Sequence, residues 1–266
     1  MAPLAIAEET LGSIRIPATM CGLVGLRPTF GRYPNDGIMP LTDHKFDQVG
    51  PFARCVDDVA LFDSVVAGDG TPLTATPLAR LRIGIADFFM SNLDPEVERV
   101  VSDAFQRLSA AGATLVSADI PDMVKASMPV ALTIILYESV AAVSSFLEAQ
   151  GTGVSFDQML EQAGDDIQVL VKGMALPPGR PAQAGYELML IERQRIRESI
   201  RDYFMRYDLT AIAFAPGPDP AADNRRQRRR DHRRSDGGAI GHDCPQYLAR
   251  DLRQLGEPGS ASGYDV

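Results

Sequence analysis

A short run near the amino terminus carries the residues of this sequence best suited to covalent chemistry. It reads Gly12-Ser13-Ile14-Arg15-Ile16-Pro17-Ala18, a turn of small residues followed by a segment in which proline favours the start of a helix. A serine hydroxyl attacks a carbonyl carbon when a base takes its proton and backbone N–H groups face the developing oxyanion. Ser13 is therefore a candidate nucleophile. A Gly-Ser pair before a helix is also a common N-cap, and the run by itself leaves both roles open.

Few other residues have the surroundings of a reactive group. Cys21 is interpreted as a small buried apolar residue, since nothing nearby in the sequence would activate its thiol. Asp47 and Gln48 are interpreted as hydrogen-bonding residues that brace a loop. The three histidines and three cysteines share no spacing typical of metal ligands (His44, His232, His242; Cys21, Cys55, Cys244). We therefore expect neither a metal nor an organic cofactor.

The segments on either side of Ser13 predict the elements that must position it. An apolar segment up to Ile6 marks the end of a buried strand, and a polar turn over residues 8–10 precedes the serine run. Residues 22–54 are dense in glycine and proline, which is typical of irregular chain around short strands. Residues 56–67 predict a helix, because acids occupy its first turn and Gly68 follows it.

The rest of the chain to residue 215 alternates strands with helices. The predicted elements are strands over 81–86, 113–120 and 209–215, one helix each over 94–111 and 186–207, and two or three helices within 125–173. The first two strands and the helix between them form a β-α-β unit. This order of elements predicts an α/β fold, with a mixed β-sheet covered by helices on both faces.

Composition restricts the class of protein. With 266 residues, 45% of them hydrophobic, the chain can bury a substantial core. The odd number of widely spaced cysteines argues against a disulfide framework and favours a cytoplasmic protein. The amino terminus lacks the basic region of a signal peptide, and no apolar run reaches the ~20 residues that a membrane-spanning helix needs. We expect a soluble protein with no membrane partner.

The chain resembles the amidase signature family in several consecutive blocks. They are residues 12–18, the run Cys21-Gly22-Leu23-Val24-Gly25-Leu26-Arg27-Pro28-Thr29, Gly31-Arg32, Asp47-Gln48-Val49-Gly50-Pro51 and the helix predicted over 56–67. Their order and spacing are those of the family, and the resemblance continues more diffusely to about Pro216. It implies the family's α/β fold and the hydrolysis of a small-molecule amide to acid and ammonia through a seryl acyl-enzyme, without a cofactor.

The resemblance also assigns roles to residues around the serine. Ser13 occupies the position of the family's nucleophile. The three residues before it occupy the positions whose backbone N–H groups bind the oxyanion (Thr10, Leu11, Gly12). Arg15 matches a family arginine that pairs with an acid, here Glu9. This pair is expected to support the loop structurally and to take no part in the chemistry.

Two departures from the family pattern bear on activity. Leu11 stands where the family usually has a second glycine; it would strain the turn if that position needs a positive φ, and otherwise only narrows the pocket. The family's base is a lysine that acts through a second serine on a cis peptide, and both lie further upstream of the nucleophile than the twelve residues available here. The three lysines match no such position (Lys45, Lys125, Lys172). We therefore expect an N-terminally truncated, incomplete amidase domain that is inactive by itself.

The sequence changes character after Pro220. Residues 221–266 contain nine arginines and seven acids, whereas residues 1–220 carry a net charge of −11 and offer no electrostatic surface for nucleic acid. The tail could bind nucleic acid, remain a disordered solvated segment, or result from translation out of frame. We favour the last, because arginine codons beginning with CG give Val, Ala, Asp or Gly when read one base later. The predicted organisation is a partial amidase-signature domain over 1–220 and an arginine-rich, disordered or frame-shifted tail over 221–266.

Two other functions remain open at this point. Within the family, the chain could be the glutaminase-type subunit of a tRNA-dependent amidotransferase. Outside it, the chain could be a non-catalytic, pseudogene-like product whose arginine tail binds nucleic acid. Nucleic acid is otherwise not expected as a partner, and a homodimer is left open.

Overall fold

The computed structural model describes residues 2–43, 45–68 and 75–215, which form two compact units. Among the described residues, the first unit contains 2–43, 45–68 and 121–203, and the second contains 75–120 and 204–215. The arginine-rich tail and all three histidines lie outside the described residues.

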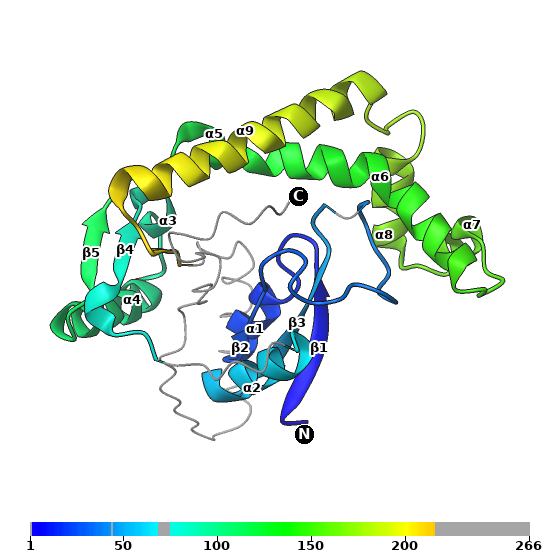
Figure 1. Ribbon diagram of the computed structural model, residues 1–266. Coiled ribbons are helices and arrows are strands. Elements are labelled where there is room, and N and C mark those ends of the chain that lie inside the picture. Colours follow the sequence, from blue (N-terminus) through cyan, green and yellow to red (C-terminus); the bar gives the residue numbers. More distant parts are fainter. Residues whose placement is uncertain (1, 44, 69–74, 216–266) are drawn as a thin grey trace, which may run out of the picture. The chain divides into compact units, whose positions relative to one another are not determined.

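The first unit contains an antiparallel sheet of three strands (Figure 1). The strands are β1 (Leu4–Glu9), β2 (Val24–Gly25) and β3 (Gln48–Ala53), in the order β1-β3-β2. Gly50 of β3 lies in a crowded place, because a Cβ there would be 2.0 Å from the carbonyl oxygen of Leu26 and 2.8 Å from Cδ1 of Ile14. Only glycine allows these two neighbouring segments to approach β3 so closely.

The strand predicted before the serine run is present, but it is less buried than expected. Ile6 of β1 is 64% exposed, which contradicts the expectation of a buried strand. The reason is that β1 is an edge strand in the described sheet and pairs only with β3. The strand also extends through Glu9, so Glu8 and Glu9 belong to the sheet and not to a turn.

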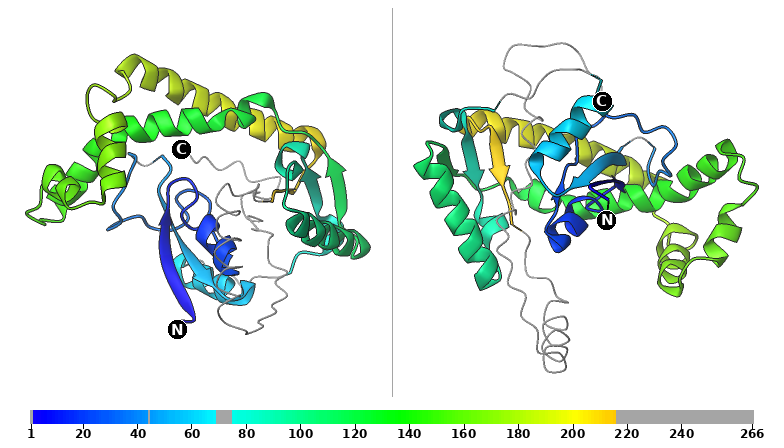
Figure 2. Two further views of the ribbon diagram at one scale, coloured as in Figure 1. Left: turned by 180° about the vertical axis from the view of Figure 1, so that it is seen from behind. Right: turned by 90° about the horizontal axis from the view of Figure 1, so that it is seen from below.

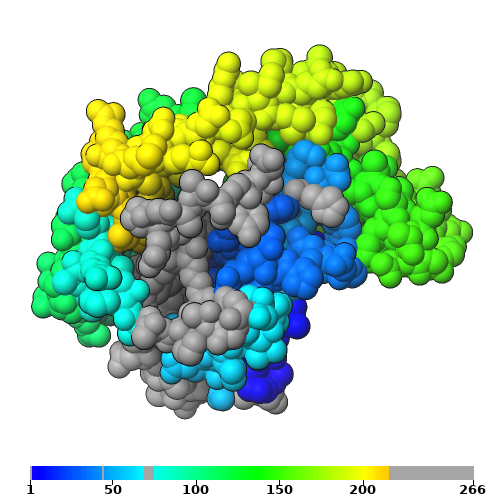
Figure 3. Space-filling model, viewed as in Figure 1, coloured from blue at the N-terminus to red at the C-terminus, as the bar shows by residue number. Residues whose placement is uncertain are grey.

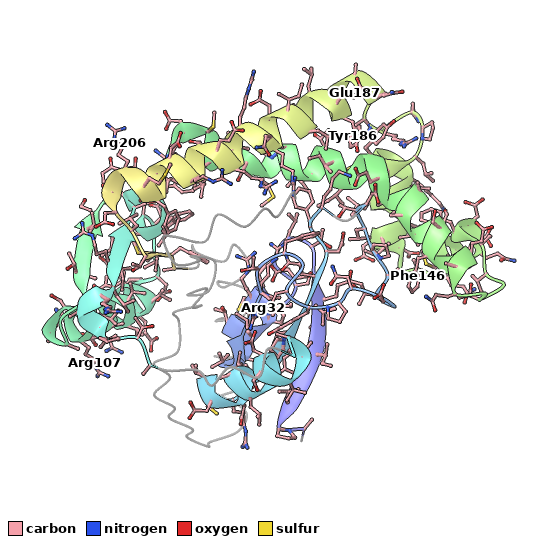
Figure 4. The ribbon with its side chains drawn as sticks, viewed as in Figure 1. Arg32, Arg107, Phe146, Tyr186, Glu187 and Arg206 are labelled. Atoms are coloured by element: carbon pink, nitrogen blue, oxygen red, sulfur yellow. The ribbon has the colours of Figure 1, made fainter. Side chains whose placement is uncertain are left out.

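Two short helices follow strands of this sheet. They are α1 (Arg15–Cys21) and α2 (Val56–Val66), the second within one residue of its predicted end. Asp63 of α2 is buried and binds two residues of the glycine-rich chain. The guanidinium of Arg32, which is labelled in Figure 4, donates to it at 2.6 and 2.8 Å, and the hydroxyl of Tyr33 donates at 2.8 Å. These bonds hold the irregular segment after β2 against α2.

The remainder of the first unit is helical. Its elements are α5 (Asp122–Lys125), α6 (Ser127–Ala149), α7 (Phe156–Glu161), α8 (Asp165–Leu170), the π-helical turn η2 (Val171–Ala175) and α9 (Gln183–Tyr207), whose last turn belongs to the second unit. A capping box formed by Ser155 and Gln158 starts α7. The rings of Tyr137 on α6 and Tyr186 on α9 stack with centroids 4.1 Å apart. Helix α9 lies at the surface along much of its length (Figure 3).

Helix α6 is unusually apolar. Among the helices that the structure describes, it is the one with the length and composition to cross a membrane, with a mean hydropathy of 1.8 over its most apolar window. This differs from the expectation that no stretch reaches that length. In the middle of α6, however, the buried carboxylate of Glu138 lies 2.7 Å from Nζ of Lys45 and accepts a hydrogen bond from Tyr186. This face of α6 therefore packs against protein.

The second unit contains a parallel sheet, also of three strands (Figure 2). Its strands are β4 (Arg82–Ile85), β5 (Thr114–Ser117) and β6 (Ala211–Ala213), in the order β5-β4-β6, and its helices are η1 (Leu78–Arg80), α3 (Asp87–Met90) and α4 (Pro95–Ala110). Helix α4 joins β4 to the parallel strand β5, so the predicted β-α-β unit is confirmed. Asp94 caps α4 by accepting from the N–H of Glu96 at 2.9 Å.

The core of the second unit is small and apolar. Leu81, Ile83, Ala113 and Ala213 are buried together, and Phe105 of α4 packs against them. With helices beside strands of both parallel and antiparallel orientation in the described chain, the predicted α/β class is confirmed.

Candidate active site

Ser13 lies in the turn between β1 and α1, and its side chain is exposed. The carbonyl of Gly12 accepts a hydrogen bond from the N–H of Ile16 at 2.8 Å, which closes the turn tightly. Ile14 is fully buried and anchors the chain immediately after the serine. We call residues 10–14 the serine turn.

Glu9, and not Ser13, caps helix α1. The cap position is Ile14, which has no side-chain cap of its own. The Oε2 of the fully buried Glu9 accepts from the N–H groups of Ile14 at 3.1 Å and Arg15 at 3.0 Å. The hydroxyl of Ser13 forms no hydrogen bond within the described part of the chain. The geometry therefore does not give Ser13 the N-cap role that the sequence left open.

Two arginines hold the Glu9 carboxylate in its ionised form. Arg15 Nη2 lies 2.5 Å from Oε1 and its Nε donates to the same oxygen at 2.8 Å, while Arg27 Nη1 lies 3.5 Å away. Burial alone would raise the pKa of Glu9, but the hydrogen bonds and charge of Arg15, together with the charge of Arg27, outweigh it, and the pKa is lowered. A negative charge is thus fixed at the start of α1, where the helix dipole favours it.

The backbone N–H groups of Leu11, Gly12 and Ser13 have no hydrogen-bond acceptor among the described residues. The carbonyl of Leu11 accepts from Nη2 of Arg15 at 3.0 Å, which orients the Leu11–Gly12 peptide. A Cβ at Gly12 would lie 2.6 Å from Cδ1 of Ile16, an exposed side chain that would have to shift to make room. Leu11 is not one of the described non-glycine residues with a positive φ, and its side chain therefore does not strain the turn.

Asp47 joins the serine turn to a second loop. Its carboxylate, 3% exposed, accepts from the hydroxyl of Thr10 at 2.8 Å. It also accepts from the N–H groups of Leu41 at 3.0 Å and Thr42 at 2.9 Å, and from the Thr42 hydroxyl. We call residues 41–43 and 45–47 the Asp47 loop. Gln48 differs from its neighbour, because its buried Oε1 accepts no hydrogen bond within the described chain.

Sequence reasoning gave no role to Glu8, which the structure places beside Asp47. Burial, and then the negative charge of Asp47, raise the pKa of Glu8 from 4.5 to about 7. The alternation of side chains along β1 could have separated it from Glu9, since successive residues of a strand face opposite sides of the sheet. The sequence does not show that Asp47 lies near Glu8.

The three lysines all bind elsewhere. Lys45 pairs with Glu138 at 2.7 Å, Lys125 lies 3.2 Å from Asp122, and Lys172 donates to Gln168 at 2.8 Å. No described lysine contacts Ser13, so the structure brings no activating amine to the serine from residues 2–43, 45–68 or 75–215. The Lys45–Glu138 pair has a structural role, because it fixes the Asp47 loop to α6.

The cysteines do not extend the site. Cys21 and Cys55 are both exposed and free, which contradicts the interpretation of Cys21 as a buried apolar residue. Cys21 is the last residue of α1, where the chain turns away through a left-handed Gly22, and this leaves its side chain uncovered. Within the described residues, no group of three or more His, Cys, Asp or Glu side chains could hold a metal ion.

Comparison with known proteins places this chain in a family. The family model for amidases matches residues 1–236. The chain is 34% identical to an indoleacetamide hydrolase from Agrobacterium vitis and 32% identical to a mandelamide hydrolase from Pseudomonas putida, over 80% and 82% of its length. It covers 46% and 45% of those proteins and so spans about half the length of these relatives.

Solved structures show that the fold is also that of amidases. The native peptide amidase from Stenotrophomonas maltophilia superposes with a TM-score of 0.63 and 25% sequence identity, over 79% of this chain and 48% of that one. The similarity of sequence and the similarity of fold cover the same share of the chain. The chain therefore belongs to the amidase family.

Proposed function

We propose that this chain carries the nucleophile and the oxyanion-binding turn of a hydrolase that acts on small carboxylic amides. The observation that carries the proposal is the exposed Ser13 on a tight turn whose N–H groups at Leu11, Gly12 and Ser13 have no acceptor in the described chain. An oxyanion needs this arrangement of fixed backbone donors, and each donor contributes roughly 10²–10³-fold in rate.

The reaction follows from this geometry. Oγ of Ser13 bonds to the carbonyl carbon of the amide, and its proton passes to a base. The tetrahedral oxyanion accepts hydrogen bonds from the turn. The sequence predicts Thr10, Leu11 and Gly12 as the donors, and of these the N–H groups of Leu11 and Gly12 are without an acceptor in the described chain. The C–N bond then breaks, the nitrogen takes a proton and leaves as ammonia, and water hydrolyses the resulting ester to the acid. No step needs a metal or an organic cofactor.

The substrate class is inferred from the relatives. Indoleacetamide and mandelamide hydrolases are named for amides of acids that carry an aromatic ring close to the carboxyl group. We infer that this chain binds a small aromatic primary amide of the same kind.

The base is inferred to lie outside the described residues. Each lysine has another partner, and a serine nucleophile without its base loses several orders of magnitude in rate. The chain alone is therefore expected to hydrolyse amides very slowly. It should still be acylated by an activated ester, because a good leaving group departs without help from an acid.

Acylation by 4-nitrophenyl phenylacetate tests the proposal. We expect one phenylacetyl group per chain by intact mass, located on the peptide that contains Ser13, and no such group in Ser13→Ala. Ammonia release from phenylacetamide is measured in parallel and should be far slower. Labelling that persists in Ser13→Ala, or that maps to a lysine, would refute the assignment of Ser13.

A further inference from the structure

A buried carboxylate tethers the serine turn from outside it. Asp47 is separated from Thr10 by 37 positions in the sequence, yet its Oδ1 accepts from the Thr10 hydroxyl at 2.8 Å with both residues buried. The other bonds of the Asp47 carboxylate are within the Asp47 loop, to the N–H groups of Leu41 and Thr42 and to the Thr42 hydroxyl. Asp47 thus has one bond to the serine turn and several that keep its carboxylate from rotating.

The Asp47 loop is itself held from the opposite side. The N–H of Asp43 donates to Glu138 at 2.8 Å, and the Lys45 ammonium lies 2.7 Å from the same carboxylate. The guanidinium of Arg193 on α9 donates to the carbonyl of Lys45 at 3.0 Å and lies over the ring of Phe46. The loop therefore gives Asp47 a fixed position from which to hold Thr10.

The serine turn needs such a tether at its first residue. Glu9 and Arg15 fix the end of the turn that enters α1, through the N–H groups of Ile14 and Arg15 and the carbonyl of Leu11. Thr10 follows the last residue of β1, and its side chain has one described partner, which is Asp47. Without that bond, the pairing of β1 with β3 would hold the chain up to Glu9, and no described side chain would hold the start of the serine turn itself.

We infer that Asp47 is a positioning residue for the oxyanion-binding turn and that it acts through the Thr10 hydroxyl. The inference rests on the proposed function, because the proposed function gives the turn its oxyanion-binding role. Asp47 touches no reacting atom. It sets the direction of the N–H groups at Leu11 and Gly12, and a displacement of about 1 Å at such donors costs on the order of 10²-fold in rate.

The first test is the kinetics of acylation by 4-nitrophenyl phenylacetate. Thr10→Val keeps the shape of the side chain and removes the hydroxyl. We expect its maximal acylation rate to fall by about 10²-fold with little change in the half-saturating ester concentration. Thr10→Ser restores the hydroxyl and should recover most of that loss. Asp47→Asn should resemble Thr10→Val, and the double variant should lose no more than the worse single variant.

A matched control separates positioning from a general loss of stability. Thr210 in the second unit also uses its hydroxyl between backbone groups, accepting from the N–H of Arg82 at 2.8 Å and donating to its carbonyl at 3.1 Å. Thr210→Val should lower Tm as much as Thr10→Val and leave acylation unchanged. A fall in acylation that matches the fall in Tm in both variants, without rescue by Thr10→Ser, would overturn the inference.

A second measurement distinguishes failure of this inference from failure of the proposed function. Backbone ¹⁵N order parameters of Leu11, Gly12 and Ser13 should fall from about 0.85 to below about 0.6 in Thr10→Val and Asp47→Asn, and should stay high in Thr10→Ser. Unchanged order parameters would overturn the positioning role whatever the kinetics. If the order parameters fall as expected and the unmodified chain is not acylated at Ser13, the positioning role stands and the hydrolase proposal fails.

Discussion

At the scale of single residues, neighbouring acids on β1 have opposite electrostatics. Glu9 is fully buried but meets two arginines and two backbone N–H groups, and its pKa is lowered. Glu8 is half-buried beside Asp47, and its pKa is raised to about 7. The sequence predicted the Glu9–Arg15 pair through resemblance. The sequence did not reveal Glu8, because the electrostatic effect of Asp47 on Glu8 acts between residues far apart in the chain.

Replacing Glu9 should reduce the stability of the fold. Glu9→Gln leaves Arg15 without its buried counter-charge, and we expect the free energy of unfolding at pH 7 to fall by about 3 kcal/mol. Because the folded pKa is lowered, this stabilisation is present above pH 4.5 and is lost as pH falls through the folded pKa. Urea denaturation followed by circular dichroism measures it. The control is Glu192→Gln, which breaks an exposed pair with Arg195 and should change stability by less than about 1 kcal/mol.

Replacing Glu8 should increase stability, whereas replacing Glu9 should reduce it. Its folded pKa of about 7 exceeds the ordinary 4.5, so its favourable contribution is complete below pH 4.5 and is lost as pH rises through about 7. Glu8→Gln should therefore raise Tm at pH 8 and leave it nearly unchanged at pH 4. Thermal melts at both pH values, with Glu98→Gln on α4 for comparison, measure the difference. An equal shift at both pH values would exclude titration of Glu8 as the cause.

At the scale of elements, most boundaries could be predicted because they depend on local chemistry. The Asp94 cap, the glycine after α4 and the helix over Val56–Val66 follow from neighbouring residues. The exposure of Ile6 could not be predicted, since it depends on which strand lies beside β1. The bond between Thr10 and Asp47 could not be predicted either, although the sequence indicated that Asp47 braces a loop.

Within strand β3, Gly50 is a position where the packing leaves no room for a side chain. Gly50→Ala would place a Cβ 2.0 Å from the Leu26 carbonyl oxygen, and we expect it to lower stability by about 3 kcal/mol or to prevent folding. Gly173→Ala in η2 is the matched control, because a Cβ there meets nothing within 4 Å. Soluble yield and urea midpoints compare the two variants. Similar midpoints would show that β3 can move away from Leu26.

At the scale of the whole molecule, each of the two units has a three-stranded sheet of its own. Removing the α4 cap with Asp94→Ala should destabilise the second unit by about 1 kcal/mol. Amide hydrogen exchange should then accelerate in β4 and β5 and stay unchanged in β3. Equal acceleration in both sheets would show that the units unfold together. The α/β class was predictable at this scale, but the division into two units was not, because it depends on contacts between distant segments.

The tether at Thr10 also has a consequence for the order of folding. Glu9 binds N–H groups five and six positions away, so the bend that presents Ser13 closes over a very short loop. Loops of about ten residues close within roughly 10–100 ns. The Asp47 bond spans 37 positions and must wait for β3 to pair with β1. We therefore expect the bend that carries Ser13 to form before its N–H groups are oriented, so that the newly made chain has the shape of the site before it has the reactivity.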